Sequence, residues 1–261
     1  MKIIILTLSF ELGGSERRAF LLARYFKQQG KDVEYWAFNN SGILAQLCSE
    51  EGIPTRIIPI NWYKGFIPMI HRLYGCLLLL FVLRKVKADI LLPHTIIPYT
   101  ACGLIWRFSG AKKCIGYEGG REFGLAGIVW ENLAVRLIPQ FICNSLHLAE
   151  EMASYYKINK RKISIIKNGI ELPPPMHSKQ WWRNALKVNE QTRLVVMVAN
   201  LSFYKDHKTL LQSWQIVISE LSAKKLEAKL LLAGKDLGTE KILKNLAKEL
   251  DIQDSVLFLG Y

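Results

Sequence analysis

Several common sequence features are scarce or missing in this chain of 261 residues. Its five cysteines are scattered and never form C-x-x-C, so they indicate neither a disulfide framework nor a zinc site and favour a reducing cytoplasm. Acidic residues are outnumbered, 22 against 35 basic, which gives a formal net charge of +13 and suits nucleotides, phospholipid surfaces or nucleic acid. Zinc-finger spacing, an RNP-like aromatic motif and a dense basic run are all lacking. Nucleic acid is therefore the least favoured of these partners.

Long hydrophobic runs are also missing. The longest, CLLLLFVL at 76–83, is too short for a bilayer, which needs about 20 apolar residues, so no membrane span is expected. The first ten residues, MKIIILTLSF, raise the alternative of a signal peptide. Glu11 breaks that apolar run and no small-residue cleavage site follows, which favours a first β-strand.

What the sequence does contain is an alternation of apolar strand-like runs with helical segments, which predicts an α/β fold with parallel sheets. Three consecutive prolines in NGIELPPPMHS suit neither a helix nor a central strand. We therefore expect a Rossmann-like domain over 1–170, a linker over 171–180 and a second, incomplete Rossmann-like domain over 181–261. The strands are expected at 2–8, 33–38, 55–60, 89–93, 112–117, 139–143 and 162–166, then at 193–200, 229–234 and 255–260. The helices are expected at 15–29, 42–51, 67–86, 97–109, 125–136 and 146–156, then at 206–222 and 239–250.

The stretch LGGSERRAFLLARYF follows the first strand. Gly13 and Gly14 allow close backbone approach, and Ser15 is expected to cap a helix whose amides then point at the loop. A helix N-terminus behind a glycine turn can hold a phosphate. The alternative is a tight turn without a ligand, and the dinucleotide fingerprint G-x-G-x-x-G is absent. The apolar residues of this helix mark one of its faces: Ala19, Leu21, Leu22, Tyr25 and Phe26.

The second candidate stretch is VVMVANLSFYKDHKTLLQSW, in which a buried strand ends at Asn200 and a loop with Lys205 follows. Ligands of open α/β sheets bind beyond the carboxyl ends of strands, so Lys205 is a candidate for a diphosphate. A solvated surface lysine is the alternative.

Three further strand ends carry polar groups. Asn168 and Gly169 form either an ordinary turn or a turn that lines the cleft at the hinge. His94, in ILLPHT, is a candidate general base or hydrogen-bond donor, with a structural histidine as the alternative. In CIGYEGGREF, Glu118 or Arg121 is a candidate acceptor contact, and a plain loop is the alternative.

These stretches, taken in order, resemble the retaining glycosyltransferases of family four, which have the GT-B architecture. The resemblance rests on GGSERR, on ICNSLHLAEEM with YKINKRKISIIKNGI, and on VVMVANLSFYKDHKTLLQSW with LLLAGKDLGTEKILKNLAKELDIQDSVLFLG. It implies two domains facing across a cleft, with a nucleotide-sugar donor mainly on the second and a glycan or lipid-linked acceptor mainly on the first. Such enzymes need no bound metal or other cofactor, because cationic side chains and helix ends neutralise the leaving diphosphate.

The resemblance also suggests roles for individual residues. His94 matches a catalytic position that contacts the sugar in relatives. The donor phosphates are expected near the four residues Gly13, Gly14, Asn200 and Lys205, and the acceptor or the cleft lining near Arg17, Glu118, Asn168 and Gly169. The basic, apolar first domain suits peripheral contact with an anionic membrane, so we expect a cytoplasmic protein associated with a membrane surface.

Two departures from the family pattern stand out. The loop from Asn200 to Tyr204 lacks the arginine that usually shares the phosphate with the lysine, and no two glutamates lie eight positions apart. We therefore expect an impaired or inactive truncated chain, with a non-catalytic protein that binds a glycan or a partner as the alternative. A sugar-nucleotide epimerase of the same architecture is the third candidate.

Overall fold

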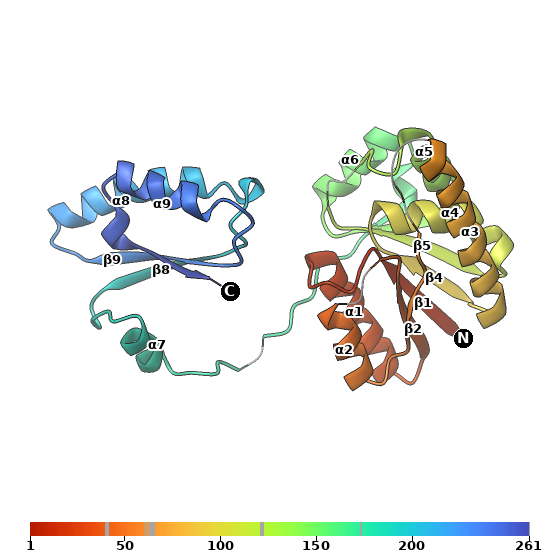
Figure 1. Ribbon diagram of the computed structural model, residues 1–261, viewed down its shortest axis with the longest axis horizontal. Helices are drawn as coiled ribbons and strands as arrows, with labels where there is room; N and C mark the ends of the chain where they lie inside the picture. The colour runs from red at the N-terminus through yellow and green to blue at the C-terminus, as the bar shows by residue number, and fades with distance from the viewer. Residues whose placement is uncertain (40–41, 61, 63–65, 121–122, 173, 261) are drawn as a thin grey trace. The chain divides into compact units, whose positions relative to one another are not determined.

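The computed structural model describes residues 1–39, 42–60, 62, 66–120, 123–172 and 174–260. The chain forms two compact units, Met1–Glu171 and Leu172–Tyr261, each built around a parallel sheet of its own (Figure 1).

The first unit contains a seven-stranded sheet in the order β3-β2-β1-β4-β5-β6-β7, and every pair of neighbouring strands is parallel. The chain builds outward from β1 on one side and then returns to start β4 on the other side. The carboxyl ends of β1 and β4 thus form a topological switch point, where open α/β sheets leave a crevice. The strands are β1 (Lys2–Thr7), β2 (Asp32–Ala37), β3 (Thr55–Ile57), β4 (Ile90–Pro93), β5 (Lys113–Glu118), β6 (Gln140–Cys143) and β7 (Ile163–Ile165).

Helices cover both faces of this sheet, because its strands are apolar on both sides. One apolar cluster joins the sheet to α1 (Gly14–Gln28) and α2 (Ile43–Glu50). The other cluster joins it to the helices on the opposite face (Figure 1). These are α3 (Phe66–Val86), α4 (Ile96–Ser109), α5 (Ile128–Leu137) and α6 (Leu146–Tyr156).

The helix α4 is the most deeply buried of these, and its glycine explains how closely α5 approaches it. A Cβ added to Gly103 would lie 2.8 Å from the Cβ of Ala134 and 2.9 Å from its carbonyl oxygen. The missing side chain therefore allows the two backbones to pack together.

The second unit contains a three-stranded parallel sheet in the order β10-β9-β8, with β8 at one edge. The helices α8 and α9 pack against it through one apolar cluster. The edge strand β8 leaves three valines exposed, and Val198 is 80% exposed. The elements are α7 (Lys179–Ala185), β8 (Arg193–Val198), α8 (His207–Ala223), β9 (Ala228–Ala233), α9 (Glu240–Glu249) and β10 (Val256–Gly260).

The predicted α/β class with two parallel sheets is confirmed, and every expected strand and helix is present within a few residues of its predicted bounds. The sequence reasoning missed α7, whose first residue, Lys179, lies in the segment expected to be a linker. Among the described residues, the structure contains no helix with the length and apolar character needed to cross a membrane.

Candidate functional site

The glycine loop leads into α1, as predicted, but the prediction of Ser15 as the helix cap is wrong. The helix begins one residue earlier, at Gly14, with Gly13 in the N-cap position and no side chain capping it. Ser15 lies inside the first turn, where its Oγ accepts a hydrogen bond from Arg18 Nη2 at 3.2 Å. The N-cap residue is a glycine, so it has no side chain with which to cap the first amides of α1.

His94 follows β4 at the switch point and is held there by backbone contacts from both neighbouring strands. Its amide donates to the Leu6 carbonyl of β1 at 2.7 Å, and it forms a parallel bridge with Tyr117 of β5. The next residue, Thr95, has a φ of +66°, which is an uncommon conformation for a β-branched residue. The chain thus turns sharply into α4, which leaves the imidazole at the carboxyl end of the sheet.

Arg18, in the first turns of α1, links three parts of this edge. Its Nη1 donates to the Tyr117 hydroxyl at 2.7 Å and to Asn168 Oδ1 at 2.6 Å, and the same hydroxyl donates to Asn168 Oδ1 at 2.8 Å. The guanidinium also lies over the Tyr117 ring, 5.1 Å from its centroid, and that ring stacks on His94 with centroids 4.6 Å apart. We call Arg18, His94, Tyr117 and Asn168 the switch-point cluster.

Two adjoining pockets open around the switch-point cluster, and both lie within the first unit. One, of about 390 Å³, contains His94 and Tyr117 together with apolar side chains of α1, including Leu22 and Tyr25. The other, of about 510 Å³, is lined by the glycine loop and the residues near it. The pockets share six residues, so they form one continuous groove: Arg18, Leu21, Asn168, Gly169, Ile170 and Glu171.

The environment of His94 keeps its imidazole neutral. The side chain is only 2% exposed, and its Nδ1 has no hydrogen-bond partner among the described residues. Burial, with a smaller contribution from the nearby Arg18 charge, lowers the pKa of His94 to about 3. Burial also raises the pKa of Tyr117, although Arg18 opposes this shift. At neutral pH the groove therefore presents an uncharged imidazole that can donate or accept a hydrogen bond.

Glu118 serves the loop beyond β5 rather than the groove. It is fully buried, and its Oε1 accepts hydrogen bonds from the amides of Gly119 and Gly120, each at 3.0 Å. This carboxylate fixes the turn after β5. Arg18 packs closely against that turn, because a Cβ on Gly119 would overlap the guanidinium. Arg121, the other candidate in this stretch, lies outside the described residues.

In the second unit, Asn200 and Lys205 lie in the exposed loop after β8, as predicted. Asn200 Oδ1 accepts from the amide of Lys235 at 3.2 Å, so the side chain ties this loop to the one after β9. Lys205 ends a short 3₁₀ turn and is exposed. In the loop after β9, Asp236 accepts from the first amides of α9, which lowers its pKa. Both loops thus lie at the carboxyl edge of the smaller sheet.

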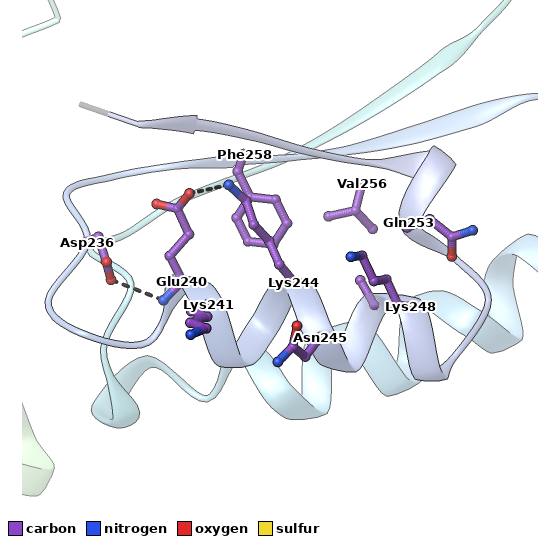
Figure 2. Close-up of a pocket in the computed structure, with 10 residues that line it drawn as sticks. Asp236, Glu240, Lys241, Lys244, Asn245, Lys248, Gln253, Val256 and Phe258 are labelled. Atoms are coloured by element: carbon purple, nitrogen blue, oxygen red, sulfur yellow. Dashed lines mark hydrogen bonds and ion pairs between the residues drawn. The ribbon is translucent and has the colours of Figure 1, made fainter.

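A larger hollow, of about 620 Å³, lies between α9 and β10 (Figure 2). It is lined mainly by the charged outer side of α9. Lys244 Nζ pairs with Glu240 at 2.6 Å and lies 5.3 Å from the centre of the Phe258 ring. We assign no ligand to it, because the charged side chains of α9 that line it, such as Lys241 and Lys248, are exposed on the outer side of one helix.

The structure thus brings five of the predicted residues together around one groove: Gly14, Arg17, His94, Asn168 and Gly169. Sequence reasoning missed the importance of Arg18 and Tyr117. Of the apolar residues expected on one face of α1, Ala19 is buried together with Phe20 and Ala23, whereas Leu21, Leu22 and Tyr25 line the groove. The sequence did contain a signal for the role of Arg18. Its spacing from Leu21, Leu22 and Tyr25 places it on the same helical face as those residues.

Among the described residues, no group of three or more histidine, cysteine, aspartate or glutamate side chains could hold a metal ion. All five cysteines are free and buried.

Comparison with protein families shows that the chain belongs to Glycosyltransferase Family 4, whose model matches residues 12–172. The model described as Glycosyl transferases group 1 matches residues 178–261. A comparison with curated protein sequences found no match. The predicted family is therefore confirmed, and the protein is a glycosyltransferase of the GT-B type.

Solved structures agree on the fold. Anabaena HepE in complex with UDP is 16% identical, with a TM-score of 0.77 over 100% of this chain and 69% of HepE. A Rickettsia africae glycosyltransferase is 16% identical, with a TM-score of 0.73 over 99% of this chain and 68% of its own. The UDP-GlcNAc 2-epimerase from Methanocaldococcus jannaschii, at 11% identity, has a TM-score of 0.57. The chain therefore spans somewhat more than two thirds of the first two structures.

Proposed function

We propose that the chain transfers a sugar from a nucleotide-sugar donor to a glycan or lipid-linked acceptor in polysaccharide or glycoconjugate biosynthesis. The observation that carries this proposal is the groove at the switch point. There a buried, neutral His94, whose Nδ1 has no hydrogen-bond partner among the described residues, lies beside the glycine loop and Arg18. Support for the donor class comes from HepE, whose structures contain UDP and, in one case, glucose.

In this proposal His94 binds a sugar hydroxyl as a neutral hydrogen-bonding group. General-base catalysis is less suited to it, because a base whose conjugate acid has a pKa of about 3 has little affinity for the proton it must remove. We propose that Gly13, Gly14, Asn200 and Lys205 serve the donor phosphates. The acceptor side is bound or shaped by four residues, Arg17, Glu118, Asn168 and Gly169. We propose retention of the anomeric configuration on the basis of the family resemblance.

The charge on the leaving diphosphate is proposed to be neutralised by Lys205 and by helix N-termini, with no metal ion. We further propose a cytoplasmic enzyme whose acceptor lies at a membrane surface. This location is supported by the excess of basic residues and by the resemblance of the chain to a family of enzymes of glycoconjugate synthesis.

Calorimetric titration with UDP tests the donor assignment. Lys205→Ala is expected to weaken UDP binding by about tenfold to 150-fold, the equivalent of a charge-assisted hydrogen bond worth about 1.5–3 kcal/mol. Lys208→Ala is the matched control, because that lysine is also exposed and lies one helical turn further along. Arg18→Ala, in the first unit, is also expected to change UDP affinity little. Equal affinities for Lys205→Ala and Lys208→Ala would remove Lys205 from the site.

A second candidate function is a non-catalytic protein that binds a glycan or a partner. The edge strand β8 favours it, because its side chains Val195, Val196 and Val198 are exposed. A transfer and hydrolysis assay with radiolabelled nucleotide sugar separates the two candidates. Turnover by the 261-residue chain would rule out the non-catalytic one, and UDP binding without turnover would favour it.

A further inference from the structure

The outer side of α3 is apolar, which is unusual for an exposed helix face. Five large side chains point away from the core, each between 56% and 66% exposed: Ile70, Leu73, Tyr74, Leu77 and Phe81. They recur at intervals of three and four residues, so they lie along one face of the helix, and we call them the α3 stripe. Cys76, Leu79 and Leu83 of the same helix are buried in the core of the first unit.

The α3 stripe differs from the outer side of α9, which presents lysines, among them Lys241, Lys244 and Lys248. The helix α5 also exposes apolar side chains, such as Val129 and Leu133, but over a shorter stretch. By contrast, α3 has no acidic residue anywhere in its sequence, FIPMIHRLYGCLLLLFVLRKV. Monomeric soluble proteins seldom expose contiguous apolar patches of this kind, and where they do, the patch commonly binds a protein or a membrane.

Basic residues gather where the α3 stripe ends. Arg84 and Lys85 occupy the last turn of α3. Arg84, Lys87 and Arg107 line a hollow of about 560 Å³ next to Phe108, which is itself 63% exposed. We call Arg84, Lys85, Lys87 and Arg107 the basic end of α3.

The charges of this basic end are not neutralised within the described part of the chain. None of its four residues forms an ion pair with a described carboxylate. Asp89, which lines the same hollow, is occupied by Lys112 at 2.7 Å and by the amide of Lys2 at 2.8 Å. The apolar stripe thus ends beside basic side chains that have no acidic partner among the described residues. Such a surface is complementary to one with an apolar interior and anionic groups at its boundary with water.

We propose that the α3 stripe and its basic end form a docking surface for an anionic lipid bilayer. The stripe lies in the plane of the membrane with its side chains among the acyl chains, and the basic end contacts lipid phosphates. From Ile70 to Lys85 this surface is about 22 Å long, at 1.5 Å per residue. The helix lies on the membrane and does not cross it, because its opposite face is part of the protein core.

A second copy of the chain is a less suitable occupant. It would bring the same cations to the interface, and α3 offers no carboxylate to pair with them. This inference rests on the proposed function, because docking on a membrane would bring the enzyme to a lipid-linked acceptor. Membrane docking is nevertheless measured separately from sugar transfer.

Flotation with lipid vesicles tests the docking surface. The 261-residue chain is expected to float with vesicles of phosphatidylcholine mixed with phosphatidylglycerol, and much less with phosphatidylcholine alone. The paired change Leu77→Ser and Phe81→Ser should reduce partitioning about 30-fold, or about fivefold for each inserted side chain. Ile216→Ser in α8 is the matched control, because that residue is 63% exposed on another helix, and it should change partitioning little.

The basic end is tested in the same assay. Arg84→Gln with Arg107→Gln should lower partitioning into the mixed vesicles by about 30-fold, since each cation contributes about fivefold near an anionic surface. The control pair, Lys208→Gln with Lys224→Gln, removes the same charge from exposed positions in the second unit. Circular dichroism verifies that each variant is folded.

Several outcomes would overturn the proposal. The first is wild-type protein that does not float. The second is stripe variants that float as well as Ile216→Ser. The third is vesicle binding that changes neither with the phosphatidylglycerol content nor with the arginine substitutions. If sedimentation shows a dimer that the stripe variants dissociate, and vesicles bind neither form, then a second copy covers the stripe. Lys205→Ala should still float normally, so a failure of the donor assignment and a failure of membrane docking are distinguishable.

Discussion

The buried imidazole of His94 is expected to make the stability of the protein depend on pH. Burial lowers its pKa to about 3 in the folded state, whereas an unfolded histidine has a pKa of about 6.5. Below pH 6.5 the unfolded chain therefore binds more protons than the folded chain, so the free energy of unfolding falls as the pH falls. At pH 5 the difference of about 1.5 units, at 1.36 kcal/mol each, gives a loss of about 2 kcal/mol relative to pH 7 or above.

The test compares wild type with His94→Asn in urea unfolding at pH 7 and pH 5. The variant lacks the imidazole that takes up a proton on unfolding. Between pH 7 and pH 5 its free energy of unfolding should therefore fall by about 2 kcal/mol less than that of the wild type. His207→Asn in α8 is the control for the second unit, where burial also lowers the histidine pKa but a backbone hydrogen bond at Ser202 and the charge of Asp206 oppose that shift. If wild type and His94→Asn lost the same stability between pH 7 and pH 5, then His94 would not be held neutral, and its proposed role as an uncharged hydrogen-bonding group would fail.

Other residues allow equally direct measurements. Gly103→Ala places a Cβ 2.8 Å from that of Ala134 and is expected to lower the free energy of unfolding by about 1–3 kcal/mol, whereas Gly14→Ala, with open space around it, should leave it nearly unchanged in the same urea titration. Glu131→Ala removes the acceptor of two buried amides and of the Tyr156 hydroxyl, and thermal or urea unfolding should show a loss of about 3 kcal/mol or more. Arg18→Met removes the bond to Asn168, so amide exchange over 167–171 should become about tenfold faster while exchange in α9 stays the same.

The alternation of apolar runs and helical segments made most of the fold predictable. Strands buried on both faces are nearly continuous apolar runs, and glycines or prolines separate them from the helices. The helix α7 was missed because three prolines dominated the interpretation of its neighbourhood, although Ser178 caps it by accepting from the amide of Trp181. A serine directly before a helical segment was the local signal for that helix.

The candidate site was predictable in position but not in composition. The rule that ligands bind at the carboxyl ends of strands led to His94, Asn168 and the glycine loop from the sequence alone. It could not reveal that Arg18 joins them, because its partners Tyr117 and Asn168 lie 99 and 150 residues away in the chain. Such contacts depend on sheet order, which residue periodicity does not encode.

Two of the three arginines of α1, Arg18 and Arg24, differ in how their charge is balanced. Arg24 is neutralised, since it pairs with Glu51 at 3.6 Å and with Glu171. Arg18, by contrast, donates only to neutral acceptors among the described residues, so its positive charge remains at the mouth of the groove. That charge lies beside an imidazole which burial keeps neutral, and it reinforces the neutrality by disfavouring a second cation. The groove therefore combines positive charge from Arg18 with an uncharged hydrogen-bonding ring at His94.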